Sequence, residues 1–237
     1  MNSAPQLSSL SIFFPAYNEE ENITRTINDA LSSAGKFTSD YEVIVVNDGS
    51  VDQTKNLVKK IASRNVHVRL HNHTHNKGYG AAIKTGLDAC TKDWIFFTDS
   101  DGQFHFDELD KFVTHKDDAD LIIGYRENRQ DPMHRIIIAK YLLRFWNYVL
   151  FGISPRDVDC AYKLFKRSVY KSISLITESA ITETEFLVRA TRGGYSYLEL
   201  PVHHYPRLYG KQTGGNAKVI IKALRESIAL WSSLHQS

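Results

Sequence analysis

The chain has 237 residues, of which 42% are apolar and 24% charged, and its formal net charge is +2. These values are typical of a globular protein with one large domain or at most two small ones. A charge so close to zero provides no basic field that would indicate nucleic-acid binding. Cys90 and Cys160 match no zinc-binding spacing, which favours a reducing compartment. Residues 1–11 have no basic segment followed by an apolar run, so we expect no signal peptide.

The first half of the chain predicts strands that alternate with helices. Apolar runs indicate strands at residues 10–15, 41–46, 66–70, 93–98 and 119–126. Helices are expected after Asn18, at residues 52–62, from residue 76 onward, and near residues 107–115. Asn18 would cap the first helix, with Glu19, Glu20 and Glu21 in its first turn. This alternation predicts an α/β fold with a mostly parallel, doubly wound sheet and flanking helices.

Two carboxylates follow the strand at residues 93–98, with one residue between them. Asp99 and Asp101 precede Gly102 and Gln103, and alternate side chains of an extended segment point the same way. At the carboxyl edge of an open α/β sheet they would face the crevice where such folds bind ligands. Oxygen ligands at this spacing suit Mg²⁺ or Mn²⁺. An Asp-rich turn explains the same residues, and the motif alone favours that interpretation.

The second half of the chain is less regular. Residues 135–151 are strongly apolar, with Lys140, Arg144 and Asn147 as one narrow polar stripe at helical spacing. Such a helix is either buried or lies at a membrane surface. No apolar run reaches the roughly 20 residues that a membrane-spanning helix requires. Further elements are expected as strands at 161–165 and 195–202, a helix at 183–190, and an amphipathic helix at 217–234 after a basic loop.

Motifs in both halves resemble the family-2 glycosyltransferases. The N-terminal motifs are Pro15-Ala16-Tyr17-Asn18-Glu19, Val46-Asn47-Asp48-Gly49-Ser50 and Asp99-Ser100-Asp101-Gly102-Gln103. Later stretches resemble the dolichyl-phosphate mannose synthase branch: Gly124-Tyr125-Arg126, residues 159–165, Glu183-Thr184-Glu185 and residues 201–207. The resemblance covers nearly the whole chain, and the ordered set is more specific than any single motif.

The resemblance implies a GT-A fold and an inverting transfer of a hexose, mannose or glucose, from a nucleotide diphosphate sugar to a polyprenyl phosphate. It implies nucleoside contacts from Pro15, Ala16, Tyr17, Glu19 and Asp48, with Asp48 on the base. It implies a divalent metal, Mg²⁺ or Mn²⁺, at Asp99, Asp101 and Gln103. It places four basic residues on the diphosphate: Arg126 and Arg207 in catalysis, and Arg135 and Lys211 in phosphate binding.

Two positions depart from the family pattern. Asn47 stands where many relatives carry a second Asp, so we give it no catalytic role. Gln212 stands where many relatives carry Ser, which leaves open a hydroxyl contact to phosphate and whether Thr213 replaces it. Glu185 is the later carboxylate that we place near the acceptor in catalysis, although a helix first-turn acid explains it equally well.

The chemistry fits these residues. Breaking a sugar–phosphate bond requires stabilisation of the leaving diphosphate, which a divalent cation and Arg or Lys side chains supply. A phosphomonoester acceptor is already mostly anionic near neutral pH, so a strong general base need not exist.

We therefore expect a single GT-A catalytic domain over residues 1–237, with a candidate interfacial helix at 135–151 and an amphipathic helix at 217–234. The protein would be peripheral at the cytoplasmic face of a membrane and would bind no nucleic acid. Two alternatives stay open: transfer to a soluble or polymeric saccharide acceptor, and a nucleotide-binding module without activity. Packing of residues 135–151 against the sheet is the rival to membrane contact.

Overall fold

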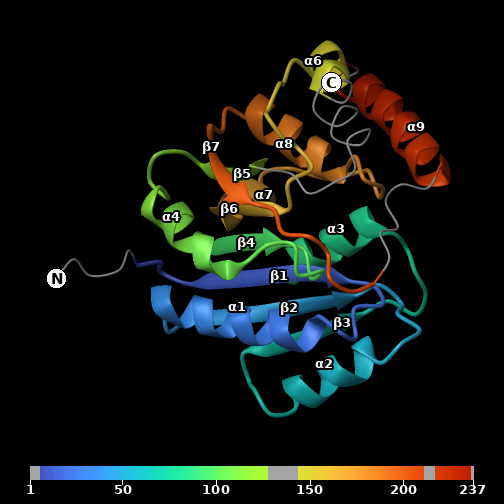
Figure 1. The fold of residues 1–237 in the computed structure, drawn as a ribbon. Helices are drawn as coiled ribbons and strands as arrows, with labels where there is room; N and C mark the ends of the chain where they lie inside the picture. Colours follow the sequence, from blue (N-terminus) through green and yellow to red (C-terminus); the bar gives the residue numbers. More distant parts are fainter. Residues whose placement is uncertain (1–5, 128–143, 211–216, 236–237) are drawn as a thin grey trace.

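The computed structural model describes residues 6–127, 144–210 and 217–235 (Figure 1). In this part of the chain, seven strands form one sheet in the order β3-β2-β1-β4-β6-β5-β7. The strands are β1 (Leu10–Ala16), β2 (Tyr41–Asn47), β3 (Val68–Asn72), β4 (Trp94–Thr98), β5 (Leu121–Glu127), β6 (Tyr162–Lys166) and β7 (Tyr197–His203). Only β6 runs antiparallel to its neighbours within this sheet. The prediction of a mostly parallel, doubly wound sheet is therefore confirmed.

Helices flank the sheet. They are α1 (Ile23–Phe37), α2 (Thr54–Ala62), α3 (Tyr79–Ala89), α4 (Leu109–Thr114), α6 (Arg144–Phe151), α7 (Arg167–Lys171), α8 (Thr182–Arg192) and α9 (Ala217–Ser233), with a 3₁₀ turn at Phe106–Glu108. α1 and α2 pack together beside β1, β2 and β3, whereas α3 packs on β1 and β2 and contacts α8. The chain winds outward from β1 to β3 and returns on the other side of β1 at β4. Because such crossovers are right-handed, α3 covers the face opposite α1 and α2.

The core lies where the central strands meet these helices. Every residue of β1 and β4 is buried, as expected for apolar strands covered on both faces. The rings of Phe13 and Phe97 stack with centroids 5.0 Å apart. A Cβ added at Gly86 of α3 would lie 2.2 Å from the Phe13 ring. Glycine at this position therefore allows α3 to pack closely on β1.

The start of α1 differs from the sequence prediction. The helix begins at Ile23, and Asn18 adopts a positive φ of 56° well before it. The Asn18 amide donates to Ser50 Oγ at 3.0 Å, and its side-chain oxygen accepts from the Val51 amide at 2.9 Å. The prediction that Asn18 caps this helix is wrong, because Asn18 instead ties the loop after β1 to the loop after β2.

Two long helical predictions fall in the second half. The C-terminal amphipathic helix is confirmed as α9. Of the helix predicted at residues 135–151, the structure describes α6, and residues 135–143 lie outside the described part. None of the described helices has the length and apolar character needed to cross a membrane.

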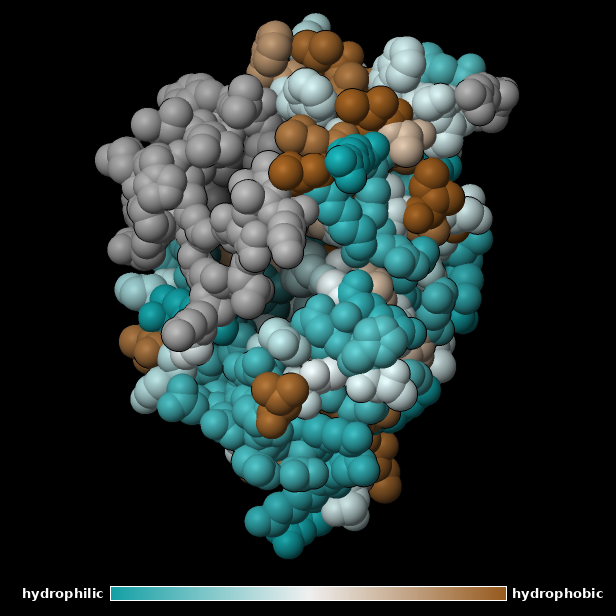
Figure 2. All heavy atoms as spheres, turned by 90° about the vertical axis from the view of Figure 1, so that its right-hand side faces the viewer, coloured by the Kyte–Doolittle hydropathy of each residue, from teal (hydrophilic) through white to brown (hydrophobic). Residues whose placement is uncertain are grey.

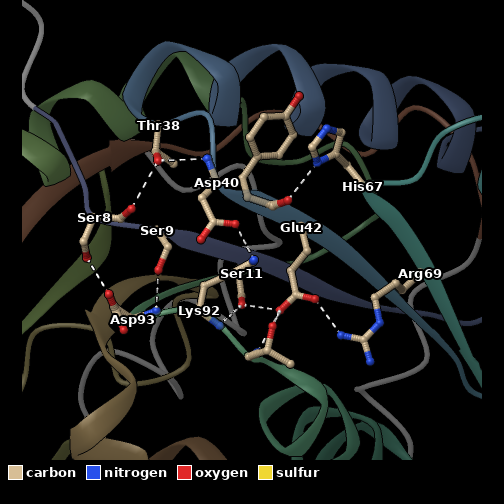
Figure 3. Close-up of polar contacts among 12 residues, drawn as sticks. Ser8, Ser9, Ser11, Thr38, Asp40, Glu42, His67, Arg69, Lys92 and Asp93 are labelled. Atoms are coloured by element: carbon tan, nitrogen blue, oxygen red, sulfur yellow. Dashed lines mark hydrogen bonds and ion pairs between the residues drawn. The ribbon is translucent and has the colours of Figure 1, made fainter.

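A buried polar network closes the amino edge of the sheet (Figure 3). Glu42, at the start of β2, accepts hydrogen bonds from Ser11 Oγ at 2.7 Å and from the Thr91 amide and hydroxyl at 2.7 and 2.8 Å. Arg69 of β3 pairs with the other Glu42 oxygen at 2.5 Å. Burial acts to raise the pKa of Glu42, but these hydrogen bonds together lower it below its ordinary value. The network thus stabilises an ionised carboxylate that joins three strands and the turn before β4.

Candidate active site

Most of the predicted site residues that the structure describes lie at the carboxyl edge of the sheet, around β1 and β4. These two strands are neighbours at the point where the winding of the sheet reverses, which is where open α/β folds bind ligands. The loops that follow β1, β2 and β4 carry the three N-terminal motifs. The segment that follows β7 returns across this edge toward the end of β1 (Figure 1).

Asp99 and Asp101 follow directly after β4. Burial raises the pKa of Asp99 well above its ordinary value, and the charges of Asp101 and Glu183 raise it further. Burial also raises the pKa of Asp101, although the Gln103 amide donates to its Oδ1 at 3.0 Å. Two carboxylates whose charged forms are disfavoured in this way would be stabilised by a cation.

Arg207, in the segment after β7, contacts the loops that follow β1 and β4. Its guanidinium pairs with Glu19 through Nη2 and donates to Asp101 Oδ2 through Nη1 at 3.3 Å. Glu19 also accepts from Asn22 Nδ2 at 2.7 Å, yet burial raises its pKa. Glu19 is therefore a buried member of the site, and the expectation that it lies in the first turn of a helix is wrong.

Gln103 positions the segment that bears Arg207. The Tyr205 amide donates to the Gln103 carbonyl at 3.0 Å, and Gln103 Nε2 donates back to the Tyr205 carbonyl at 3.1 Å. The rings of His105 and Tyr205 stack at 4.0 Å. Gln103 thus holds the two segments together, and its predicted role as a metal ligand stays a prediction.

The end of β1 is bound to the neighbouring motifs through its backbone. Ser100 Oγ donates to the Pro15 carbonyl at 2.6 Å, and the Asp48 amide donates to the Ala16 carbonyl at 2.9 Å. Tyr17 begins the loop that follows. The structure therefore brings Pro15, Ala16 and Tyr17 to the same edge as the aspartates, and their contacts with a nucleoside remain a prediction.

Asp48 organises the loop that leads into α3. Its carboxylate accepts from the amides of Lys77 and Gly78, both at 2.9 Å, and contacts His73 Nδ1 at 2.6 Å. Gly78 has a positive φ of 102°, which favours glycine. Asp48 thereby shapes the wall of the site, and its contact with a nucleobase remains a prediction. The sequence favours an exposed polar strand end for His73, but its side chain is buried against Asp48.

A further carboxylate, the buried Glu183, lies next to Asp99 on the far side of the Tyr79 hydroxyl. Tyr79 Oη lies 3.0 Å from Asp99 Oδ1 and 3.0 Å from Glu183 Oε1. Lys163 pairs with the other oxygen of Glu183 and donates to the carbonyls of residues 158 and 160 at 3.1 and 2.6 Å. The sequence interpretation did not identify Tyr79 or Lys163 as members of the site. The two glycines that flank Tyr79 were the available sequence signal of close backbone packing at this point. In the structure a Cβ on Gly80 would clash with the start of α8.

Arg126 lies at the end of β5 and makes a two-pronged pair with Asp157. Its Nε and Nη2 donate to the two Asp157 oxygens at 2.6 and 2.7 Å. Burial, together with the charges of Glu183 and Asp157, raises the pKa of Asp159 to about 6. Arg126 therefore sits in a carboxylate-rich wall, and its contact with a diphosphate remains a prediction.

Glu185 faces away from this group of carboxylates. It is fully buried, and its oxygens accept from the amides of Ile176 and Thr177 at 2.8–3.0 Å and from Arg189 Nε at 2.6 Å. These partners bind α8 to the segment before it. The geometry favours the structural interpretation of Glu185, and Glu183 is the acid of this motif that contacts the site. Arg135 and Lys211, with Gln212 and Thr213, lie outside the described residues.

The donor set fits a hard divalent cation. Within residues 6–127, 144–210 and 217–235, no three His, Cys, Asp or Glu side chains are grouped to hold a metal. Asp99 and Asp101 would supply two carboxylates to a cation, and Mg²⁺ is usually shared between one or two carboxylates and substrate phosphates.

The chain is similar to glycosyltransferases in sequence. A family model described as Glycosyl transferase family 2 matches residues 11–174. Two relatives from Trichomonas vaginalis are named dolichyl-phosphate beta-glucosyltransferase. ALG5D is 28% identical over 243 residues, covering 92% of this chain and 73% of its own length. ALG5A is 30% identical over 214 residues, covering 81% of this chain and 64% of its own length.

Solved structures share the fold. Glucosyl-3-phosphoglycerate synthase from Mycobacterium tuberculosis, in complex with Mn²⁺, UDP and glucosyl-3-phosphoglycerate, matches with a TM-score of 0.70 and 18% identity. The match covers 95% of this chain and 79% of that one. The mannosyltransferase PcManGT from Pyrobaculum calidifontis, in complex with GDP-Man and Mn²⁺, has a TM-score of 0.65 and 18% identity, over 96% and 67% of the two chains. The predicted GT-A fold is confirmed.

Proposed function

The chain belongs to glycosyl transferase family 2, and we propose that it transfers a hexose, with inversion, from a nucleotide diphosphate sugar to a polyprenyl phosphate. The observation that carries this proposal is the contact of Arg207 with both Glu19 and Asp101, which joins the nucleoside-side motif to the acidic motif. The names of ALG5D and ALG5A support a dolichyl-type phosphate as acceptor and favour glucose over mannose.

The leaving diphosphate is the group that this site is built to stabilise. A divalent cation, Mg²⁺ or Mn²⁺, would supply positive charge on the diphosphate when bound at Asp99 and Asp101; Mn²⁺ in the two structural neighbours supports this assignment. Arg207 lies beside Asp101 and can transfer its hydrogen bonds from Glu19 to a phosphate oxygen. Arg126, Arg135 and Lys211 are further candidates for the diphosphate. Tyr17, Asp48 and the end of β1 would hold the nucleoside.

The acceptor requires orientation more than deprotonation. A polyprenyl phosphate is already largely anionic near neutral pH, so its oxygen can attack without a strong base. The isoprenoid chain partitions into a bilayer, and we therefore place the protein peripherally at a membrane. Both cysteines are free and buried thiols, in keeping with the reducing conditions of the cytoplasmic face.

A donor screen tests the proposal. Purified protein is incubated with radiolabelled UDP-glucose, UDP-GlcNAc, GDP-mannose and GDP-glucose, each with a short polyprenyl phosphate in detergent and with Mg²⁺, Mn²⁺ or EDTA. We expect label to enter the organic phase from one hexose donor, in a reaction that EDTA abolishes. Label that enters only a soluble saccharide would support the alternative acceptor class, and donor binding without turnover would indicate a module that has lost activity.

A further inference from the structure

α6 and α9 lie side by side and together form an area with exposed apolar side chains (Figure 1). We call this area the α6–α9 face; its exposed apolar residues are Phe145, Tyr148, Val149, Ile221, Leu224, Ile228 and Trp231. Their exposed fractions run from 41% to 64%, although each is large and apolar or aromatic. The two helices lie together at the upper right of Figure 1, and hydrophobic side chains gather in the upper part of the view in Figure 2. An exposed apolar area of this kind indicates a contact surface.

The two helices are fixed to each other and to the site. Trp146 Nε1 donates to Ser227 Oγ at 3.2 Å, so the indole points into the seam between α6 and α9. Glu226 of α9 accepts from the amides of residues 178 and 179, both at 3.1 Å. These residues lie just before Glu183, which contacts the site through Tyr79. The face is therefore held in a defined orientation to the proposed reaction centre.

Most of the charged side chains on the face are positive. Arg144, Lys222 and Arg225 are exposed. Glu226 is the one acid in the sequences of α6 and α9; its Oε2 accepts from the backbone amides of residues 178 and 179, and its Oε1 lies 3.7 Å from Lys222 Nζ. Tyr148 and Trp231 add the amphipathic aromatic rings that are enriched at the level of lipid headgroups. An apolar area edged by cations and by such rings matches a bilayer that contains anionic lipid.

We propose that the α6–α9 face is the membrane-contact surface of this protein and that it binds bilayers containing anionic lipid. This inference rests on the proposed function, because it names the surface on which the lipid acceptor would be met. In this arrangement Trp146 holds the two helices together, and Phe145, Tyr148 and Ile228 face the lipid.

Vesicle co-sedimentation tests the surface. The full chain is mixed with vesicles of phosphatidylcholine alone and of phosphatidylcholine with phosphatidylserine. We expect binding to the anionic vesicles that weakens with salt, and roughly tenfold weaker binding of Phe145→Glu and Ile228→Glu. Val66→Glu is the matched control, because Val66 is 93% exposed next to β3, away from α6 and α9, and should bind as wild type does. Circular dichroism confirms that each variant is folded.

The outcomes separate this surface from the proposed reaction. Two results would overturn the proposal: wild-type protein that does not bind anionic vesicles, and an equal loss of vesicle binding in the Val66→Glu control. Phe145→Glu that converts a dimer to a monomer without changing vesicle binding would show that the face pairs two copies, and would overturn it too. Transfer to a short acceptor in detergent does not need the face, so failure there, with vesicle binding intact, would overturn only the proposed function.

An independent observation concerns Tyr79, whose hydroxyl lies between two carboxylates of like charge. Its Oη is 3.0 Å from both Asp99 Oδ1 and Glu183 Oε1, and Lys163 pairs with the far oxygen of Glu183. The ring of Tyr79 is packed near Phe97, with centroids 6.5 Å apart. We propose that Tyr79 is a positioning residue that fixes the orientation of Asp99 for the divalent cation. This second inference rests on the cation of the proposed function.

The affinity for Mn²⁺ tests this role without any turnover. Free Mn²⁺ is measured by electron paramagnetic resonance during titration of the wild type, Tyr79→Phe and Tyr170→Phe. Tyr170 is the matched control, because its hydroxyl also donates to a carboxylate, Asp88, at 2.6 Å but in another part of the chain. Hydrogen bonds to metal ligands typically change affinity by 10- to 100-fold, so we expect at least tenfold weaker binding for Tyr79→Phe alone. Unchanged affinity in Tyr79→Phe, or an equal loss in both variants, would overturn the role.

Discussion

The two edges of the same sheet hold buried carboxylates in opposite electrostatic conditions. At the amino edge, Glu42 receives four hydrogen bonds or ion-pair contacts, and its pKa lies below the ordinary value. At the carboxyl edge, Glu19 is buried and Asp99 and Asp101 are partly buried, and loss of solvent raises the pKa of each. Both clusters are polar and largely removed from solvent, so burial alone does not distinguish them.

The difference lies in how completely the protein itself satisfies the charge, because Arg207 pairs with both Glu19 and Asp101 and yet the pKa of each carboxylate stays raised. A fully hydrogen-bonded carboxylate stabilises the fold, whereas a cluster of like charges costs folding free energy and is retained where a ligand supplies the missing positive charge. We therefore assign the amino edge to stabilisation of the fold and the carboxyl edge to ligand binding and catalysis. Four predictions follow from this assignment, in order of decreasing effect.

Removing the Asp101 charge should have the largest effect on activity. Asp101→Asn keeps the shape of the side chain but removes one of the two carboxylates that would bind the cation. We expect the rate of transfer to fall by at least a hundredfold, as when a group that stabilises transition-state charge is lost. Single-turnover transfer of labelled hexose measures this rate. Full activity of Asp101→Asn in a metal-buffered assay would contradict the assignment of the two carboxylates to cation binding.

Removing Arg207 should lower the rate more than it lowers donor affinity. The guanidinium would act on the diphosphate as negative charge builds there, so its contribution is greatest in the transition state. We expect Arg207→Ala to lose about a hundredfold in kcat with a smaller change in KM. Initial rates over a range of donor concentrations separate the two constants, and equal changes in both would reduce Arg207 to a binding or surface residue.

Glu42→Gln should affect stability and leave the chemistry unchanged. The new amide places a donor against groups that already donate, and it leaves Arg69 without its carboxylate. Loss of hydrogen bonds to a buried charged group predicts a decrease of about 2–3 kcal/mol in the free energy of unfolding. Urea unfolding followed by circular dichroism measures this decrease. A kcat that falls with stability, measured per folded molecule, would contradict the division between the two edges.

The two edges should also respond to pH with opposite signs. A carboxylate with a raised pKa binds its proton more tightly in the folded state, so its contribution to stability is present at low pH and is lost as pH rises. For Asp159 this window runs from its ordinary value of 3.8 to about 6. Glu42, with a lowered pKa, contributes stability above its ordinary pKa and loses it as pH falls.

Melting temperatures between pH 4 and pH 7 test these signs. We expect Asp159→Asn to remove part of the decrease in stability on going from pH 4 to pH 6. Glu42→Gln should be most destabilised at neutral pH and least at acid pH. A pH profile of Asp159→Asn that superimposes on that of the wild type would show that this carboxylate does not carry the raised pKa.

The mostly parallel character of the sheet could be predicted from the sequence, whereas the antiparallel position of β6 between β4 and β5 and much of the site could not. Apolar runs such as the one in β2 and the acidic motif after β4 locate the strands and the edge at which ligands bind, because these features are local. The resemblance assigns Glu19 to the nucleoside site, but the local pattern placed it in the first turn of a helix, because an acid after Asn18 satisfies the rules for a helix start. Its partner, Arg207, is 188 residues away, and no local pattern reports such a contact.

The second layer of the site was missed for the same physical reason. Tyr79, Lys163 and Glu183 come from α3, β6 and α8, and they meet only because the sheet brings these elements together. Glu185 was preferred over Glu183 because both acids lie in one helical turn, and the sequence does not say which of them faces the site. A buried lysine is also not expected from composition, since its burial depends on a partner that only the fold supplies.

The most direct test of the difference between the two edges is the thermal stabilisation produced by Mn²⁺ together with a nucleoside diphosphate at neutral pH. A ligand that binds the folded state raises the melting temperature in proportion to its affinity. We predict that the wild type and Glu42→Gln both gain stability from the pair of ligands, whereas Asp101→Asn gains little. Equal stabilisation of Asp101→Asn, or loss of the response in Glu42→Gln, would contradict the assignment of ligand binding to the carboxyl edge.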